Sequence, residues 1–331
     1  MQVRPSRRVF LSCLTGAGAA AISTATMRLS SATETWPQRA VKLVVPFAAG
    51  SGTDTLSRMV GDRLAAAIGQ PVVIENKGGA SGMIGARSVA EAQPDGYTFM
   101  VGTQTTQAAN VALFKAIPYD PITAFAPVSL LATVSVVVVV NPQLQMNTIA
   151  ELVEAARAKP GAFTAGYGTG AAQIFQEMFQ AATGTKFLGV PYKSNPQALT
   201  AVTANEISMM IVDMGTVRGL AEAKSVIPLA ISGNKRSRLL PNIPTLAESG
   251  YNGFDADIWY GMFAPAATPG AILNSLQKTI HDALASTELR DRLIAAGFEP
   301  APSTPDQLGN RVRDDIASWT NYARLAGIVP Q

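Results

Sequence analysis

Reactive side chains are scarce in this sequence of 331 residues, which has one cysteine and one histidine. The cysteine, Cys13, lies in an N-terminal segment that we expect to be removed. The remaining chain then has no thiol, which excludes disulfides, cysteine nucleophiles and cysteine-based metal sites. A single histidine argues against a Ser-His-Asp triad, a Cys-His pair and an ordinary zinc site. We expect this residue, His281, to be exposed on a surface helix.

Nucleotide-binding and hydrolase motifs are also missing. Residues 50–52 begin a G-x-G-x-x-G pattern, but the third glycine is replaced by Thr55, and after residues 168–170 it is replaced by Gln173. The sequence contains no P-loop and no G-x-S-x-G elbow. We therefore expect no cofactor, no metal and no enzyme activity.

Charge is low and nearly balanced, with 15% charged and 47% hydrophobic residues. The net charge of the whole chain is +3, but residues 1–32 contain four arginines and no acid. The remaining 22 basic and 23 acidic residues give a net charge of −1. This balance gives no reason to expect a nucleic-acid or membrane-surface partner.

The N-terminus has the three parts of an export signal. The pair Arg7-Arg8 precedes a short apolar stretch, residues 12–22, and the small residues 30–32 then offer a cleavage site. The paired arginines indicate the twin-arginine type of signal, at residues 1–32. The apolar stretch is shorter than the roughly 20 residues of a membrane span. We therefore expect a periplasmic protein; cleavage after Ala25, or a basic tail that is not a signal, are the alternatives.

From residue 40 onward, strand-like and helix-like patterns alternate, which is typical of an α/β fold with parallel strands. A βα set in the first half is followed by a second set, so we expect two α/β lobes that face each other across a cleft. The expected strands are residues 41–46, 71–75, 97–101, 134–140, 163–167, 207–212, 226–232 and 259–265. The expected helices are residues 56–68, about 83–92, 148–159, 173–182, 271–286, 288–296 and 305–325.

Two loops of small residues stand where a strand ends and a helix begins. The first N–H groups of a helix have no intrahelical partner, and the helix dipole makes this end partly positive. Such loops can bind a carboxylate without lysine or arginine, one loop for each end of a dicarboxylate. The alternative is that their Gly, Ser and Thr residues are only helix caps. The candidate residues in these loops, and in the loop after the third strand, are Phe47, Ala48, Ala49, Gly50, Ser51, Gly52, Thr53, Asp54, Thr103, Gln104, Gly168, Thr169, Gly170, Ala171 and Gln173.

Two further side chains are candidates for the same cleft. Asp213 ends an apolar strand, where it would accept a hydrogen bond from a ligand or else cap the next turn. Tyr192 would line the cleft or else pack in the core. Phe47 and Ala48 would form an apolar floor under the first loop.

Several motifs together resemble the periplasmic substrate-binding proteins of tripartite tricarboxylate transporters, the Bug family. The resemblance covers essentially the whole chain after the signal. Its markers are residues 36–37 (WP), 45–47 (VPF), 49–54 (AGSGTD), 75–82 (ENKGGASG), 94–98 (PDGYT), 191–193 (PYK), 236–237 (RS), 240–241 (LP), 244–248 (PTLAE) and 259–261 (WYG).

The resemblance implies a type II periplasmic-binding-protein fold with two lobes that close on a carboxylate, and a membrane permease as partner. It also implies that loops 47–54 and 166–173 hold the carboxylate through backbone amides and waters. The chain departs from the family at Gln173, where a histidine is frequent, and at Ser194, where a glycine is usual. We expect lobe 1 at residues 33–137 and 257–331, and lobe 2 at residues 138–256.

Three functions fit these observations to different degrees. The first is a monomeric, non-enzymatic solute-binding protein that delivers a small carboxylate to the permease. The second is a periplasmic sensor that presents a bound carboxylate to a membrane signalling partner. The third, a hydrolase or isomerase, is disfavoured by the single histidine and the absent thiol.

Overall fold

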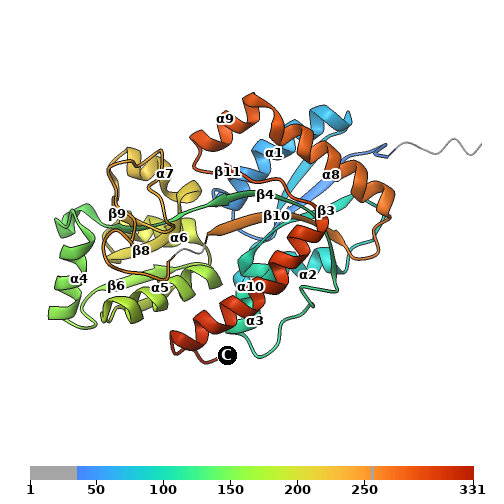
Figure 1. Cartoon of the computed structure of the whole chain (residues 1–331). Helices are drawn as coiled ribbons and strands as arrows, with labels where there is room; N and C mark the ends of the chain where they lie inside the picture. The colour runs from blue at the N-terminus through green and yellow to red at the C-terminus, as the bar shows by residue number, and fades with distance from the viewer. Residues whose placement is uncertain (1–35, 255–256) are drawn as a thin grey trace, which may run out of the picture. The chain divides into compact units, whose positions relative to one another are not determined.

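The computed structural model describes residues 36–254 and 257–331. The expected export signal, with Cys13, lies outside the described residues. The described residues belong to one compact unit that contains two β-sheets, sheet A and sheet B (Figure 1). In this part of the chain, every helix is too short or too polar to cross a membrane.

Sheet A has six strands in the order β11-β4-β10-β3-β1-β2. Strands β1, β2 and β3 run parallel, and β10 joins them antiparallel to β3. The carboxyl ends of β1 and β3 and the beginning of β10 therefore meet at one edge of the sheet. The strands are β1 (Val41–Val45), β2 (Val72–Asn76), β3 (Thr98–Thr103), β4 (Phe125–Val134), β10 (Ile258–Pro265) and β11 (Glu299–Pro300).

Helices cover both faces of sheet A because its strands are apolar on both sides. On β1, Leu43 packs in the core with residues of α1 and α8, and Val44 packs in a second core with residues of α2 and α10. This alternation follows from the two-residue period of a strand. The helices are α1 (Gly52–Ile68), α2 (Met83–Ala90), α3 (Asn110–Leu113), α8 (Gly270–Ala285), α9 (Thr287–Ala295) and α10 (Pro305–Leu325), with short helical turns η1 (Ala80–Gly82) and η2 (Thr105–Ala109).

Sheet B has five strands in the order β7-β6-β8-β5-β9. Strands β6, β7 and β8 are parallel, so their carboxyl ends also meet at one edge. All five valines of β5 are buried, as expected for a central strand. The strands are β5 (Val136–Val140), β6 (Thr164–Tyr167), β7 (Leu188–Pro191), β8 (Met209–Asp213) and β9 (Ile227–Ile231), and the helical elements are η3 (Pro142–Leu144), α4 (Ile149–Ala158), α5 (Gly170–Thr183), α6 (Asn195–Thr203) and α7 (Met214–Glu222).

The chain changes from sheet A to sheet B at Ser135. The expectation of one strand over residues 134–140 is wrong, because β4 ends at Val134 in sheet A and β5 begins at Val136 in sheet B. Met214 N–H donates to the carbonyl of Ser135 at 3.0 Å and thereby fixes the crossing. The valines are buried on both sides of the crossing, so the hydrophobic pattern contains no sign of it.

Other expected elements are present, with shifted ends. Helix α1 begins at Gly52 rather than at residue 56, and α5 begins at Gly170 rather than at residue 173. Both small-residue loops therefore contribute the first turn of a helix. The sequence analysis did not predict β4, β7, β11, α3, α6 or α7.

Candidate functional site

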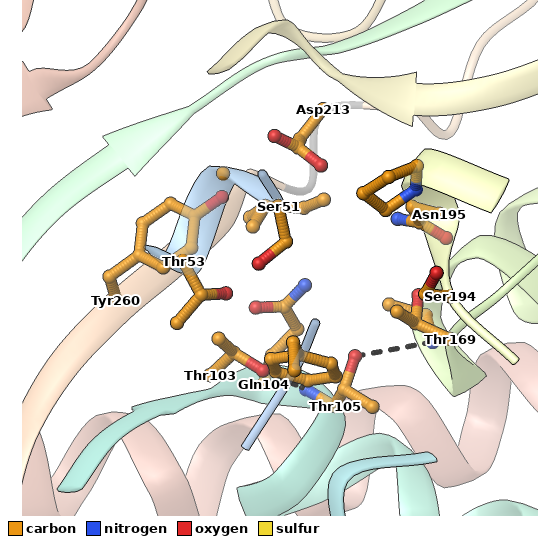
Figure 2. Close-up of a pocket in the computed structure, with 15 residues that line it drawn as sticks. Ser51, Thr53, Thr103, Gln104, Thr105, Thr169, Ser194, Asn195, Asp213 and Tyr260 are labelled. Carbon is orange, nitrogen blue, oxygen red and sulfur yellow. Dashed lines mark hydrogen bonds between the residues drawn. The ribbon is translucent and has the colours of Figure 1, made fainter. Parts of the chain in front are cut away.

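A small cavity, the inner cavity, lies where the loops after β1, β3, β6 and β8 come together (Figure 2). It has about 30 Å³ of free space, room for about two water molecules. No lysine, arginine or histidine lines it in the described part of the chain. Its lining residues are Phe47, Ser51, Gly52, Thr53, Thr103, Gln104, Thr105, Thr169, Ala171, Ser194, Asn195, Pro196, Asp213, Ile258 and Tyr260.

The N-termini of four helices point toward this cavity. The N-cap residues of α1, α5, α6 and α7 are Ser51, Thr169, Ser194 and Asp213, and all four line it. Each cap side chain accepts a hydrogen bond from a backbone N–H of its own helix. Each helix start is partly positive, so their convergence favours an anion although no lysine, arginine or histidine of the described residues lines the cavity.

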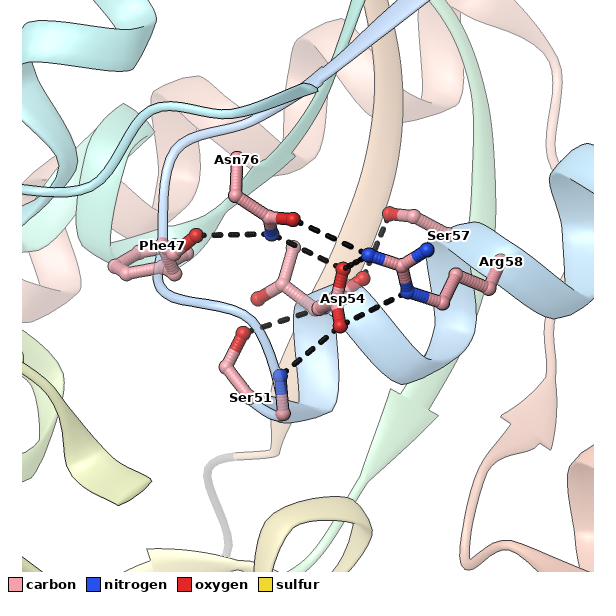
Figure 3. A network of polar contacts seen from close by, with 8 residues as sticks. Phe47, Ser51, Asp54, Ser57, Arg58 and Asn76 are labelled. Atoms are coloured by element: carbon pink, nitrogen blue, oxygen red, sulfur yellow. Dashed lines mark hydrogen bonds and ion pairs between the residues drawn. The ribbon is translucent and has the colours of Figure 1, made fainter. Parts of the chain in front are cut away.

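The first loop is held in place by the carboxylate of Asp54, which is almost fully buried (Figure 3). It accepts hydrogen bonds from Gly50 N–H and from Asn76 Nδ2, each at 3.0 Å. Arg58 adds Nε at 3.1 Å and Nη2 at 2.9 Å. Burial alone would raise the pKa of Asp54, but the hydrogen bonds from Arg58, Gly50 and Asn76 outweigh it and lower the pKa. Asp54 is therefore a charged support under the loop.

Among the described residues that line the inner cavity, Asp213 is the only charged one, and it is 5% exposed. Its Oδ1 accepts from Thr216 N–H at 2.8 Å, and the Thr216 hydroxyl lies 2.8 Å from Oδ2. Burial raises the pKa of Asp213, while hydrogen bonds from Thr216 and Asn195 oppose this shift. Tyr260 is also buried beside Asp213, and its pKa is raised well above the ordinary value by burial and by the Asp213 charge.

Two backbone N–H groups at helix starts donate hydrogen bonds to hydroxyl groups of segments that belong to the other sheet. Gly52 N–H donates to Thr216 Oγ1 at 2.8 Å, and Gly170 N–H donates to Ser81 Oγ at 2.7 Å. A Cβ atom at Gly52 would collide with Asp213 Oδ1 and approach the Tyr260 hydroxyl to 2.8 Å. Glycine at position 52 therefore permits the close approach of α1 and α7.

A larger cavity, the outer chamber, adjoins the inner cavity and has about 470 Å³ of free space. Thr169 and Ser194 line both spaces. The other lining residues of the outer chamber are Ala48, Asn76, Gly78, Gly79, Ala80, Ser81, Phe114, Tyr167, Gly168, Gly170, Gln173, Tyr192 and Lys193.

Comparison with known proteins identifies the family. The sequence model of the tripartite tricarboxylate transporter family receptor matches residues 56–327. The chain belongs to this receptor family. It is 32% identical to Protein BugT of Bordetella pertussis over 309 residues, which cover 92% of this chain and 95% of BugT.

Two solved structures resemble this receptor along nearly the whole of their length. R. palustris Rpa4515 with adipate is 35% identical with a TM-score of 0.88, covering 89% of this chain and 100% of that one. The periplasmic binding protein BugD is 31% identical with a TM-score of 0.86, covering 89% and 100%. The predicted type II periplasmic-binding-protein fold is confirmed. Members of the family are solute-binding proteins and not enzymes, as the sequence indicated.

The structure distributes the candidate residues of this receptor over three places. Those that line the inner cavity are Phe47, Ser51, Gly52, Thr53, Thr103, Gln104, Thr169, Ala171 and Asp213. Those that line the outer chamber are Ala48, Gly168, Thr169, Gly170, Gln173 and Tyr192. Ala49, Gly50 and Asp54 line neither space. Gly50 and Asp54 instead bond to each other beneath the first loop.

Sequence reasoning missed six residues of the inner cavity. Ser194, Asn195 and Pro196 open α6, and a serine cap followed by proline in the first turn is a helix-start signal that could have found them. Tyr260 and Ile258 line the inner cavity because β10 pairs antiparallel with β3, and no local sequence pattern predicts this pairing. The sixth residue is Thr105, in η2.

The expectation for His281 is wrong in one respect, because its side chain is half-buried. The ring Nε2 lies 2.9 Å from the carbonyl oxygen of Ser303, which ties α8 to the segment before α10. His281 lines neither cavity. Residues 36–254 and 257–331 contain no group of three His, Cys, Asp or Glu residues that could hold a metal ion.

Proposed function

We propose that this receptor is an exported solute-binding protein that captures a small carboxylate in the inner cavity. The observation that carries the proposal is the convergence of four helix N-termini on a space that no cationic side chain lines in residues 36–254 and 257–331. A carboxylate there would receive hydrogen bonds from backbone N–H groups and stabilisation from the helix dipoles. The adipate bound by the relative Rpa4515 is a molecule of this chemical class.

The donors for such a ligand can be named. Thr53 N–H, in the first turn of α1, has no hydrogen-bond partner within the described residues. The Ala171 N–H of α5 has only a long contact, 3.4 Å, to Thr105 Oγ1. A ligand oxygen near both groups would accept a hydrogen bond from the unpaired Thr53 N–H and a stronger bond from Ala171 N–H than its present contact. The hydroxyls of Thr53, Thr103 and Thr169 would add further donors from the cavity wall.

We propose two lobes at residues 33–137 with 257–331 and at residues 138–256. The change of sheet at Ser135 supports a hinge near the first boundary. Ligand binding would draw the lobes together across the inner cavity, where Gly52 and Thr216 are already in contact. The site would comprise the candidate residues of both loops with Tyr192 and Asp213, and Asp54 would act from behind the first loop.

Family membership and the N-terminal sequence support a proposal for the cellular role. We propose that residues 1–32 are a cleaved twin-arginine signal, that the protein works in the periplasm as a monomer, and that it passes its ligand to the permease of a tripartite tricarboxylate transporter. The receptor description of the family supports this role.

A thermal-shift screen with matched ligands tests the proposal. The purified protein would be heated with acetate, succinate, adipate, citrate, benzoate and amino acids. A ligand at a hundredfold excess over its Kd stabilises the folded state by about 2.7 kcal/mol. The neutral amide of any acid that binds, with every carboxyl group converted, is the control, because it nearly keeps the shape and loses the charge. A shift with an acid and none with its amide supports the proposal; no shift with any acid would refute it.

A further inference from the structure

The free space of the site is divided very unequally between its two cavities. The inner cavity has about 30 Å³ and the outer chamber about 470 Å³, and Thr169 and Ser194 line both. An inner cavity with room for about two waters can accept the two oxygens of one carboxylate. The body of a ligand whose carboxylate lies there then has to extend into the outer chamber.

Aromatic rings reach the outer chamber from both sheets. Phe114 follows α3 on the side of sheet A, while Tyr167 ends β6 and Tyr192 follows β7 in sheet B. Tyr192 N–H donates to the carbonyl of Tyr167 at 2.8 Å, which fixes the backbones of these two residues relative to each other. All three side chains are half-buried.

These three rings have no aromatic partner in the described part of the chain. Many of the other rings do pair: Phe175 lies 5.4 Å from Trp319, between ring centroids, in an edge-to-face arrangement. An aromatic ring prefers a stacked or edge-on ring neighbour. Unpaired rings around an open space therefore suit a flat aromatic molecule.

Four glycines, at positions 78, 79, 168 and 170, also line the outer chamber. A Cβ atom at these positions would meet neighbouring protein atoms; at Gly170 it would lie 2.7 Å from Leu113 Cδ1, and at Gly79 2.8 Å from Ile84 Cδ1. The glycines therefore permit close packing of the segments that form the chamber wall.

We propose that the ligand is an aromatic carboxylate, with its carboxylate group in the inner cavity and its ring in the outer chamber between Phe114, Tyr167 and Tyr192. The inference rests on the proposed function, because it assumes that the inner cavity binds a carboxylate. It adds the chemical class of the rest of the ligand.

Calorimetric titration of the purified protein with matched acids tests this inference. Benzoate is paired with cyclohexanecarboxylate, and phenylacetate with cyclohexylacetate, so that only the flatness and aromaticity of the ring change. We expect the aromatic acid of at least one pair to bind at least tenfold more tightly than its saturated partner. Equal or tighter binding of the saturated acid in both pairs would overturn the inference.

Variants test the rings themselves. We expect Tyr192→Leu to weaken binding of the preferred aromatic acid at least fivefold and to change adipate binding less than twofold. Phe114→Leu provides a second test should the first variant fold poorly. Leu188→Ala is the matched control, since Leu188 is 60% exposed on β7 and lines neither cavity. Equal losses for adipate and the aromatic acid in both ring variants would count against the proposed ring site.

The two proposals fail in different ways. If acetate, adipate and the aromatic acids all fail to bind, the proposed carboxylate site fails, and this inference with it. If aliphatic acids bind and neither aromatic pair shows a preference, only the aromatic inference fails.

Discussion

Replacing Asp54 with alanine tests whether a charged support under the first loop prepares the site. The change removes the acceptor of Gly50 N–H and of Asn76 Nδ2, both at 3.0 Å. Losing the partner of a buried polar group costs about 1–3 kcal/mol. Gly50 is exposed and Asn76 half-buried, so water replaces part of this loss. The Arg58 side chain is 53% exposed, and its ion pair contributes about 0–1 kcal/mol. We therefore expect a loss of about 2 kcal/mol in the free energy of unfolding.

The effect on ligand binding should be larger than the effect on stability suggests. Without Asp54, residues of the loop before α1 have to be ordered when the ligand binds. Fixing the backbone of two residues costs about 2–4 kcal/mol, which lowers affinity by about 30- to 1,000-fold. Calorimetric titration with the best acid of the screen, together with urea unfolding, measures both quantities.

Asp62→Ala is the control for this experiment, because Asp62 is an exposed acid on the same helix. It should leave affinity and stability nearly unchanged. Wild-type affinity in Asp54→Ala would show that the loop keeps its shape without the carboxylate, and the reasoning would be refuted.

Three further predictions follow from the same geometry. Gly52→Ala places a Cβ atom against Asp213 and should abolish the thermal shift with every acid. Gly219→Ala is the control: Gly219 lies in α7 with open space around it, so this change should stabilise the protein by about 0.5–1 kcal/mol. A normal thermal shift in Gly52→Ala would contradict the close approach of α1 and α7. Because the pKa of Asp54 is lowered, its stabilising effect is complete above its ordinary value of 3.8 and is lost as pH falls below it, so the difference in unfolding free energy between wild type and Asp54→Ala should shrink in acid. The pKa of Asp213 is raised, so its effect on the pH dependence of stability is opposite: wild type should lose stability relative to Asp213→Asn as pH rises above 3.8. Urea unfolding of wild type and the two variants across this pH range measures both differences in unfolding free energy. A difference that does not change with pH would refute the pKa shift assigned to that residue.

Local patterns predicted much of the fold and part of the cavity wall. Residues 50–54 and 168–173 combine a strand end, glycines and a cap residue within a few positions, so both loops could be placed from the sequence. The caps Ser51 and Thr169 then line the inner cavity because a helix start and its cap are inseparable. These features depend only on neighbours along the chain.

The parts that were missed depend on distant pairing. Tyr260 reaches the inner cavity because β10 pairs with β3, whose residue Thr103 is its register partner. The crossing at Ser135 lies inside an unbroken apolar run, and burial in either sheet produces the same pattern. The hydrogen bond between His281 and Ser303 likewise joins segments that approach only in the folded protein.

Within the part of the chain that the structure describes, no cationic side chain lines the inner cavity, and this has a consequence for the ionic strength at which the protein can act. Charged side chains attract ligands over a distance close to the Debye length, about 10 Å at 0.1 M ionic strength, and added salt weakens this attraction. Backbone N–H groups and helix starts act only within about one helical turn, and here they do so in a buried space. The association rate and the affinity of an anion for the inner cavity should therefore vary little between low and high ionic strength.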